Sequence, residues 1–322
     1  MTTYQSSINL QHTTDIEFNH WVNRFVDGLT AIGMVQTADT GQTSFGSPLI
    51  PIPGTNTDAG FQIWRFDDAQ HAAGNPLICR FDFGTDATAG DAAIDITVGT
   101  TTDGAGTMTG SVADTFELHS NLAPATPKTG PIFMCHAEGF LGIYFGKGAM
   151  SNPAQPRIAW FTGFVCRSTD ADGVPDSEAF FITTQHLGGG QTGVYEQCPA
   201  HQSVDYASGT VHGVVAVGNG VNPPFGFLPS SNFLSNNTAT NEAADGSIAI
   251  FPCFGVNPHP FPVPQLVWGW AIDIPENLTF TATPVGTTQH TYMAQSGMLM
   301  GPNGAAIEEN QGINAMMAFI WE

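Results

Sequence analysis

After one helical segment near its start, this chain reads as strands and turns to its end, and that change of period limits its possible folds most strongly. From Phe61 onward, apolar and polar residues alternate in short runs such as "LICRFDFGT" and "AIDITVGT", which is the period of half-buried strands. Glycine, proline, asparagine and aspartate separate these runs, as turns do. We therefore expect an all-β fold, a sandwich or a jelly roll, with one amphipathic N-terminal helix.

The helical segment is "TTDIEFNHWVNRFVDGLTAIG", residues 13–33. Thr14 and Glu17 have the spacing of a capping box, and Gly33 is suited to end the helix. Apolar residues at helical spacing form one stripe: Phe18, Trp21, Val22, Phe25, Val26 and Leu29. Two dockings stay open for this stripe, on the chain's own sandwich or on a neighbouring subunit, with Phe18, Trp21 and Phe25 as the candidate contacts.

The expected organisation has three parts: a helix and arm over residues 1–46, a first β-sandwich region over 47–200, and a second β region over 201–322. The last boundary rests on the stretch "YEQCPAHQSVDYASG", which interrupts the strand-like runs. The second region could also form one continuous domain with the first. No fixed-period repeat is visible, which argues against solenoids and propellers.

The charge balance excludes several kinds of partner. There are 28 acidic residues and 7 basic ones, for a formal net charge of −21. Nucleic-acid binding requires cations that displace counterions from phosphates, and anionic membranes repel such a chain. No apolar run reaches the roughly 18 residues of a membrane span. The N-terminus has neither the basic nor the apolar region of a signal peptide, which predicts synthesis in the cytoplasm.

The glycine-rich stretch "GTTTDGAGTMTG", residues 99–110, superficially resembles a phosphate-binding loop. A phosphate loop needs a lysine directly after its last glycine, and a dinucleotide loop needs a helix there. The sequence that follows is rich in threonine and strand-like. The stretch is therefore interpreted as a turn with positive-φ glycines between two strands, and no cofactor is expected.

Two stretches have weak metal-site character. "DADGVPDSE" places four carboxylates within residues 170–178. A solvated hairpin loop is the preferred interpretation, because the glycine spacing is not that of an EF-hand. Calcium binding stays open as the alternative. Cys198 and His201 have a spacing that zinc ligands use, but no second pair matches it. We therefore expect no metal site.

The cysteines are odd in number and scattered, at positions 79, 135, 166, 198 and 253. We interpret them as buried free thiols made in a reducing cytoplasm. One or two disulfides in an assembled particle are the alternative.

No catalytic residues are predicted. The G-x-S-x-G turn of serine hydrolases is absent, and no carboxylate pair stands out as a glycosidase pair. The segment "NPHPFPVPQLVWGW" has a proline-rich loop with Phe261, Trp268 and Trp270. Core packing or subunit contact is favoured for these rings over stacking on a sugar. Phe319 and Trp321 of the last strand are further candidates for contacts with neighbours.

Several stretches together resemble a group of tailed-bacteriophage virion proteins. They are the N-terminal helix with "GMVQTADTGQ", then "TNTDAGFQIWRFDDA", "PLICRFDFGT" and "ITVGTTTDGAGTMTG", and near the end "TYMAQSGMLMGP" and "MMAFIWE". The resemblance covers residues 1–110 well and the last 35 loosely. It implies a component of the phage particle, in or around the tail or its tip, and carries no catalytic residues over.

The sequence thus favours a non-enzymatic virion structural protein of the tail, baseplate or collar, made in the host cytoplasm and located in the virion. Its expected partners are copies of itself in a homo-oligomer and other virion proteins. The alternative is a receptor- or glycan-binding tail-tip module that uses loops such as 222–233 and 257–270, and a polysaccharide depolymerase is a third hypothesis. A chain without residues 1–33 is expected to stay soluble and to lose its place in the particle.

Overall fold

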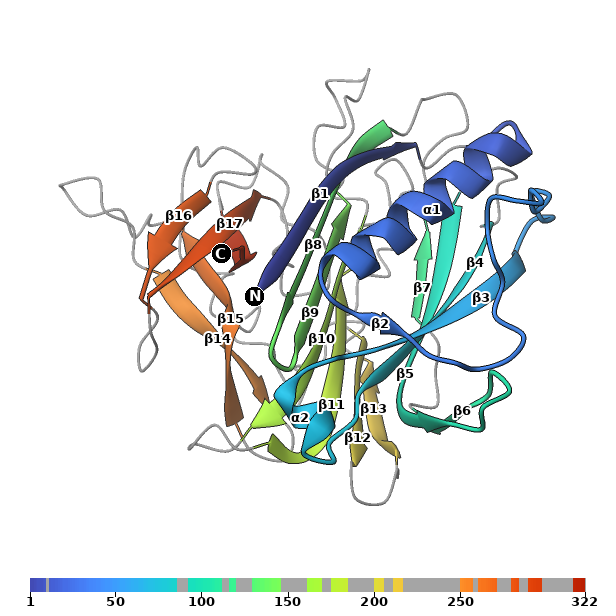
Figure 1. The fold of residues 1–322 in the computed structure, drawn as a ribbon. Coiled ribbons are helices and arrows are strands. Elements are labelled where there is room, and N and C mark those ends of the chain that lie inside the picture. Colours follow the sequence, from blue (N-terminus) through green and yellow to red (C-terminus); the bar gives the residue numbers. More distant parts are fainter. Residues whose placement is uncertain are drawn as a thin grey trace.

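The fold is all-β, with three antiparallel sheets and one long helix (Figure 1). This is a computed structural model. It describes residues 1–9, 12–85, 92–111, 116–119, 129–145, 161–169, 175–184, 200–205, 211–216, 250–256, 260–270, 279–283, 289–296 and 315–321. Its helices are α1 (Asp15–Ala31) and α2 (Ala69–Ala72).

Sheet I is a meander in the order β2-β3-β4-β5-β6, in which β7 also pairs with β5. Because consecutive strands are neighbours, each connection is a local hairpin or loop. The strands are β2 (Val35–Gln36), β3 (Thr57–Arg65), β4 (Ile78–Thr85), β5 (Ala92–Thr102), β6 (Met108–Ser111) and β7 (Phe116–His119).

Sheet II has the order β1-β8-β9-β10-β11-β12-β13, so the N-terminal strand forms the edge of a second meander. The expected domain boundary at 200/201 falls inside β12, which pairs with strands on both sides. The strands are β1 (Thr2–Asn9), β8 (Thr129–Ala137), β9 (Phe140–Phe145), β10 (Phe161–Thr169), β11 (Pro175–Thr184), β12 (Ala200–Asp205) and β13 (Val211–Ala216).

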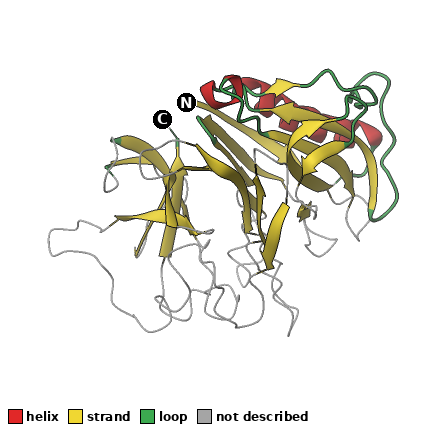
Figure 2. Ribbon diagram, turned by 90° about the horizontal axis from the view of Figure 1, so that it is seen from below, coloured by secondary structure: helices red, strands yellow, loops and turns green. Residues whose placement is uncertain are grey.

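Sheet III has the order β14-β15-β18-β17-β16. In this sheet β15 lies beside β18 rather than beside β16, which is the strand order of a Greek key. The strands are β14 (Ile250–Val256), β15 (Pro260–Trp270), β16 (Thr279–Ala282), β17 (His290–Ser296) and β18 (Ala315–Ile320). The N- and C-terminal ends lie close together in both views (Figures 1 and 2).

Local chemistry fixes both ends of α1. The Glu17 backbone N–H donates to Thr14 Oγ1 over 3.3 Å, and the Thr14 N–H donates to Glu17 Oε2 over 3.1 Å, which completes a capping box. At the other end Gly33 has a φ of +86°, and the Met34 N–H donates to the Leu29 carbonyl. These are the features of a Schellman ending, which requires a residue that tolerates positive φ.

The apolar stripe of the helix packs against both sheet I and sheet II, and its other side is exposed. Toward sheet I, the Phe25 ring lies 5.3 Å from Phe81 and 5.6 Å from Phe83, measured between ring centroids. Toward sheet II, Gly28 leaves so little space that a Cβ there would lie 2.4 Å from Met134 Sδ and 2.9 Å from Tyr4 Cδ1. One hydrophobic cluster therefore contains residues of α1 and of both sheets.

Sheet III packs against the opposite face of sheet II. On β8, Met134 belongs to the core shared with α1, whereas the neighbouring Phe133 points to the other face, as alternation in a strand requires. The ring of Phe133 meets Trp321 at 5.6 Å, and Trp321 meets Phe319 at 6.0 Å. The strand β8 thus has apolar contacts on both faces of sheet II.

Removing one α1 aromatic tests the shared core. We expect Phe25→Ala to lower the free energy of unfolding by about 3–5 kcal/mol, because it removes a fully buried ring from between two sheets. The matched control is Ile16→Ala on the same helix, where the side chain is 66% exposed and the change stays within about 0.5 kcal/mol. Urea unfolding measures both values, and equal effects of the two substitutions would contradict this packing.

Candidate functional site

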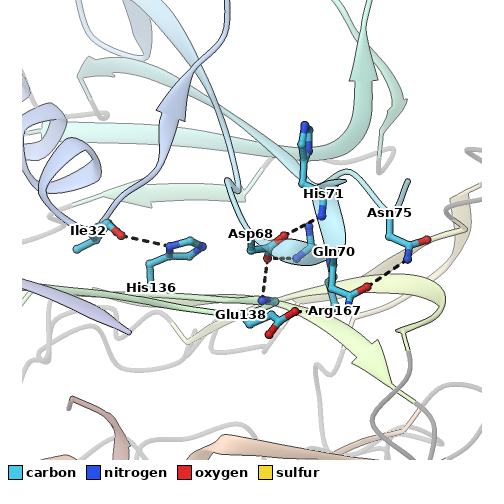
Figure 3. Close-up of polar contacts among 9 residues, drawn as sticks. Ile32, Asp68, Gln70, His71, Asn75, His136, Glu138 and Arg167 are labelled. Carbon is cyan, nitrogen blue, oxygen red and sulfur yellow. Dashed lines mark hydrogen bonds and ion pairs between the residues drawn. The ribbon is translucent and has the colours of Figure 1, made fainter. Parts of the chain in front are cut away.

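A group of buried polar contacts meets at Asp68, between α2 and sheet II (Figure 3). Asp68 is the N-cap of α2, and its Oδ1 accepts from the His71 backbone N–H over 2.9 Å. Its Oδ2 accepts from the Gly139 N–H over 3.0 Å and pairs with Arg167 Nη1. A single carboxylate therefore ties a short helix to two segments of another sheet.

Arg167 projects from β10 and has a side chain only 1% exposed. Its guanidinium carbon lies 5.3 Å from the centre of the Phe66 ring, a cation–π contact. Its backbone N–H donates to the Gly139 carbonyl over 2.8 Å. We call Asp68, Gly139 and Arg167 the polar clamp.

Gly139 can serve the polar clamp because of its backbone conformation. It lies in the turn between β8 and β9 with a φ of +71°, which favours glycine. A Cβ there would also lie 3.4 Å from Arg167 Cβ. Any side chain at this position would therefore strain the turn and crowd the arginine.

His136 extends this polar region to the end of α1. Its Nδ1 lies 3.2 Å from the Ile32 carbonyl, which caps the helix. Its ring meets Phe66 edge-on at 5.2 Å. Burial lowers the pKa of His136, so at neutral pH the ring is uncharged and Nδ1 is the donor to Ile32.

The electrostatics of the polar clamp favour a permanently charged pair. Burial alone would raise the pKa of Asp68, but Arg167 and the N–H groups of His71 and Gly139 outweigh it, and the pKa is lowered. A carboxylate held in this way is a poor general base at neutral pH, because its proton affinity is low. Nearby Cys79 is fully buried, and burial raises the pKa of its thiol, which disfavours the nucleophilic thiolate.

The polar clamp is therefore suited to holding segments together. Its carboxylate accepts hydrogen bonds from two backbone groups and one cation, and its cation is covered by an aromatic ring. Breaking such a buried pair exposes an uncompensated charge to the interior.

Asn19 is a second buried polar connector, on the flank of α1. Its Nδ2 donates to the Asp15 and Ile50 carbonyls, and its Oδ1 accepts from the Gly46 and Ile50 N–H groups. The side chain is thus fully satisfied while it attaches residues 46–50 to the helix. The apolar periodicity gave no indication of this role, because a buried asparagine looks like a surface residue in the sequence.

The residues of the polar clamp also escaped the sequence analysis, although two signals existed. Asp68 begins "DAQHA", a stretch that ends in a short helix. Arg167 is one of only 7 basic residues and stands within an apolar strand, where a cation needs a partner. Neither signal shows that Asp68 and Arg167 pair with each other.

Within the glycine-rich stretch, residues 103–107 form a turn between β5 and β6, which confirms that interpretation. Asp103 Oδ1 accepts from the Ala105 and Thr107 N–H groups, and Gly104 and Gly106 have φ values of +77° and +97°. The segment 37–43 crosses over this turn through a hydrogen bond from the Thr40 N–H to the Gly104 carbonyl. These N–H groups thus donate to oxygen atoms of the turn itself.

Three of the predicted contact residues lie inside the chain's own core. Phe18, Trp21 and Phe25 are at most 1% exposed. Of the two dockings left open by the sequence, the structure has the intramolecular one, and these side chains have no surface left for a neighbour. This packing argues against the expectation that a chain without residues 1–33 stays soluble, because that deletion would remove the helix from a core shared by two sheets.

The aromatic residues near the C-terminus are placed on strands. Phe261, Trp268 and Trp270 belong to β15, in the interior of sheet III, so residues 260–270 are not a loop as expected. The register between β14 and β15 shifts at Pro252/Cys253, which lets this proline-rich strand pair. Phe319 is 1% exposed, and Trp321 is half-buried against Phe133.

Other predicted features are only partly covered by the structure. Residues 170–174, 222–233 and 257–259 and Cys198 lie outside the described residues. The flanking strands β10 and β11 pair antiparallel, as a hairpin around 170–174 requires. Cys79 and Cys135 are buried free thiols, as predicted.

Among the described residues, no three His, Cys, Asp or Glu side chains gather as metal ligands would. The helices in this part of the chain are also too short or too polar to cross a membrane. In the comparisons with known proteins, no family model and no curated protein matches this sequence.

Two adjacent aspartates provide a test of the polar clamp. We expect Asp68→Ala to lower the free energy of unfolding by about 3–5 kcal/mol, because it leaves Arg167 buried without its carboxylate. Asp67→Ala is the matched control, since Asp67 pairs with Arg65 at a side-chain exposure of 51% and such pairs contribute at most about 1 kcal/mol. Thermal and urea unfolding measure both, and an Asp68→Ala chain as stable as Asp67→Ala would contradict the assignment.

Proposed function

We propose that this chain is a structural component of a bacteriophage particle, in the tail, baseplate or collar, and that it acts through subunit assembly. The observation that carries the proposal is where the phage-like stretches lie in the fold. Residues 33–42, 55–69, 76–85 and 96–110 build sheet I together with the segment and turn that cover it. The better-covered part of the resemblance thus follows a contiguous structural unit, whereas its C-terminal stretches include β17 and β18 of sheet III.

The use of polar side chains in this unit supports an architectural role. Gln42 of the phage-like "VQTADTGQ" donates to the Thr37 carbonyl over 2.8 Å and accepts from the Ile63 N–H over 2.8 Å. It thereby fixes the segment after α1 onto β3. Like the polar clamp, it satisfies backbone groups of the chain itself, which supports cohesion as the work of these residues.

The finer fold belongs to the same proposal. We infer that sheets I, II and III act as layers of a sandwich, with α1 filling the space between the first two. The contacts of α1 with Phe81 and Met134 and the contact of Phe133 with Trp321 support this layering. The meanders of sheets I and II favour a sandwich over a jelly roll, whose strands follow Greek-key connections.

The receptor-binding alternative has less support than the sequence suggested. Of its two candidate loops, 222–233 and 257–270, the second is strand β15 of sheet III over residues 260–270. The depolymerase hypothesis would need two facing carboxylates at a groove. The buried carboxylate of Asp68 is instead paired with Arg167.

The location of the chain tests the proposal directly. Antiserum raised against the purified chain should label intact phage particles from a host that carries its gene, at one site in immunogold electron microscopy. Particles disrupted in denaturant should release a protein of 34.0 kDa. Particles without the chain, or release of reducing ends from host polysaccharide by the purified chain, would contradict it.

The net charge generates a further prediction about self-assembly. Copies with a formal charge of −21 repel one another, and salt screens that repulsion. Raising NaCl from 0.05 to 0.5 M, roughly a threefold shortening of the screening length, should therefore shift the purified chain toward its homo-oligomer. Sedimentation velocity measures the shift. An oligomer that dissociates on adding salt would instead indicate contacts between opposite charges.

A further inference from the structure

The N-terminal arm, residues 1–14, joins the edge of sheet II to α1. Among its described residues only Ile8 and His12 are buried, and the rest are exposed or half-buried. The arm is held chiefly by the β1–β8 pairing, in which Thr2 lies opposite His136 and Asn9 opposite Thr129. An edge strand that buries little apolar surface is among the elements that open most easily.

His12 stands out in this arm because it is buried and makes no hydrogen bond. Its side chain is 3% exposed, and its ring lies 5.6 Å from Phe18 and 5.5 Å from Trp21. Neither of its ring nitrogens has a hydrogen-bond partner, and nor does Trp21 Nε1. A buried polar group of this kind calls for an explanation.

A proton on His12 would place a positive charge among these rings. Burial lowers the pKa of His12 from 6.5 to about 4, because the charged ring loses its hydration. Glu17 is the carboxylate that faces His12, and its charge offsets only part of the lowering of the pKa by burial. Glu17 Oε2 is already engaged by the N–H groups of Thr13 and Thr14.

The other end of the arm meets a second buried histidine, His136. Burial lowers the pKa of His136 as well. The groups that face it are the Asp68 carboxylate and the Ile32 carbonyl, which raise the pKa, and the Arg167 guanidinium and the Met1 ammonium, which lower it. One end of the arm therefore contains a buried histidine, His12, and the other end pairs with another, His136. The fold lowers the pKa of both.

We propose that the N-terminal arm is an acid-released strap: protonation of His12 frees residues 1–12 and uncovers the β8 edge of sheet II, while α1, with its Thr14 cap, and sheet I stay folded. Release hydrates the His12 ring and removes its cost of burial. It also separates β1 from a neighbouring strand whose remaining partner, β9, stays paired. The uncovered β8 edge could then pair with another strand.

The direction of the pH effect follows from linkage. His12 has a pKa of about 4 in the docked arm and recovers its ordinary 6.5 when released. The released state therefore binds more protons, so docking is strongest above pH 6.5 and weakens as the pH falls toward 4. Between pH 6.5 and pH 4 the equilibrium constant for release rises by about 80-fold, out of a limiting change of about 300-fold reached beyond both pKa values.

Hydrogen exchange of the full-length chain between pH 7 and pH 4.5, corrected for intrinsic rates, tests the strap. Peptides of β1 should lose protection as the pH falls, while peptides of β4 and β5 keep theirs. His12→Phe should remove most of the pH dependence and leave only the contribution of His136, because phenylalanine cannot titrate. His20→Phe is the matched control, since His20 is exposed on α1, and it should behave like the natural chain.

Two results would overturn the strap: an unchanged pH dependence in His12→Phe, or a simultaneous loss of protection in β4 and β5. Should His12→Phe not fold, the natural chain still decides the matter. Its His12 Cε1–H resonance should titrate below pH 5 in the folded state. A titration near pH 6.5 would show that the docked arm tolerates the proton, and the proposal would fail.

Discussion

The rest of the described structure depends on the packing of the apolar stripe of α1 against sheets I and II. One face of the helix meets Phe81 and Phe83, and Gly28 lets the other face approach Met134 closely. Both sheets bury apolar side chains against this helix, since the hydrophobic cluster contains residues of all three elements. A helix of 17 residues owes its stability to such packing more than to its intrinsic propensity.

The buried polar groups follow from the same constraint. A layered core leaves backbone groups of loops and turns near the interior, and each of them needs a partner. Asn19 satisfies residues 46–50 beside α1, and Asp68 satisfies α2 and Gly139 while it neutralises Arg167. Polarity in this part of the chain therefore maintains contacts between segments, which supports the proposed role in assembly.

Local sequence predicted the local features, and distant contacts lay beyond it. The all-β class follows from the alternating runs, and the Gly104 and Gly106 turn from glycines that tolerate positive φ. The capping box of Thr14 and Glu17 occurs as its spacing indicated. The Asp68–Arg167 pair joins residues 99 positions apart, and periodicity contains no information on such a pairing. The spacing of the aromatic stripe predicted the helix. Whether the stripe packs on this chain or on another depended on contacts between residues far apart in the sequence, which periodicity does not contain.

Cooperativity of unfolding tests the central claim most directly, because sheets that share one helix should unfold together. Hydrogen exchange with mass spectrometry across a urea titration at neutral pH would follow peptides of β4 and β5 in sheet I and of β8 and β9 in sheet II. We expect α1 and both sheets to lose protection at one common urea midpoint with one common slope. Sheet II retaining protection after α1 and sheet I have opened would contradict a core held together by this helix.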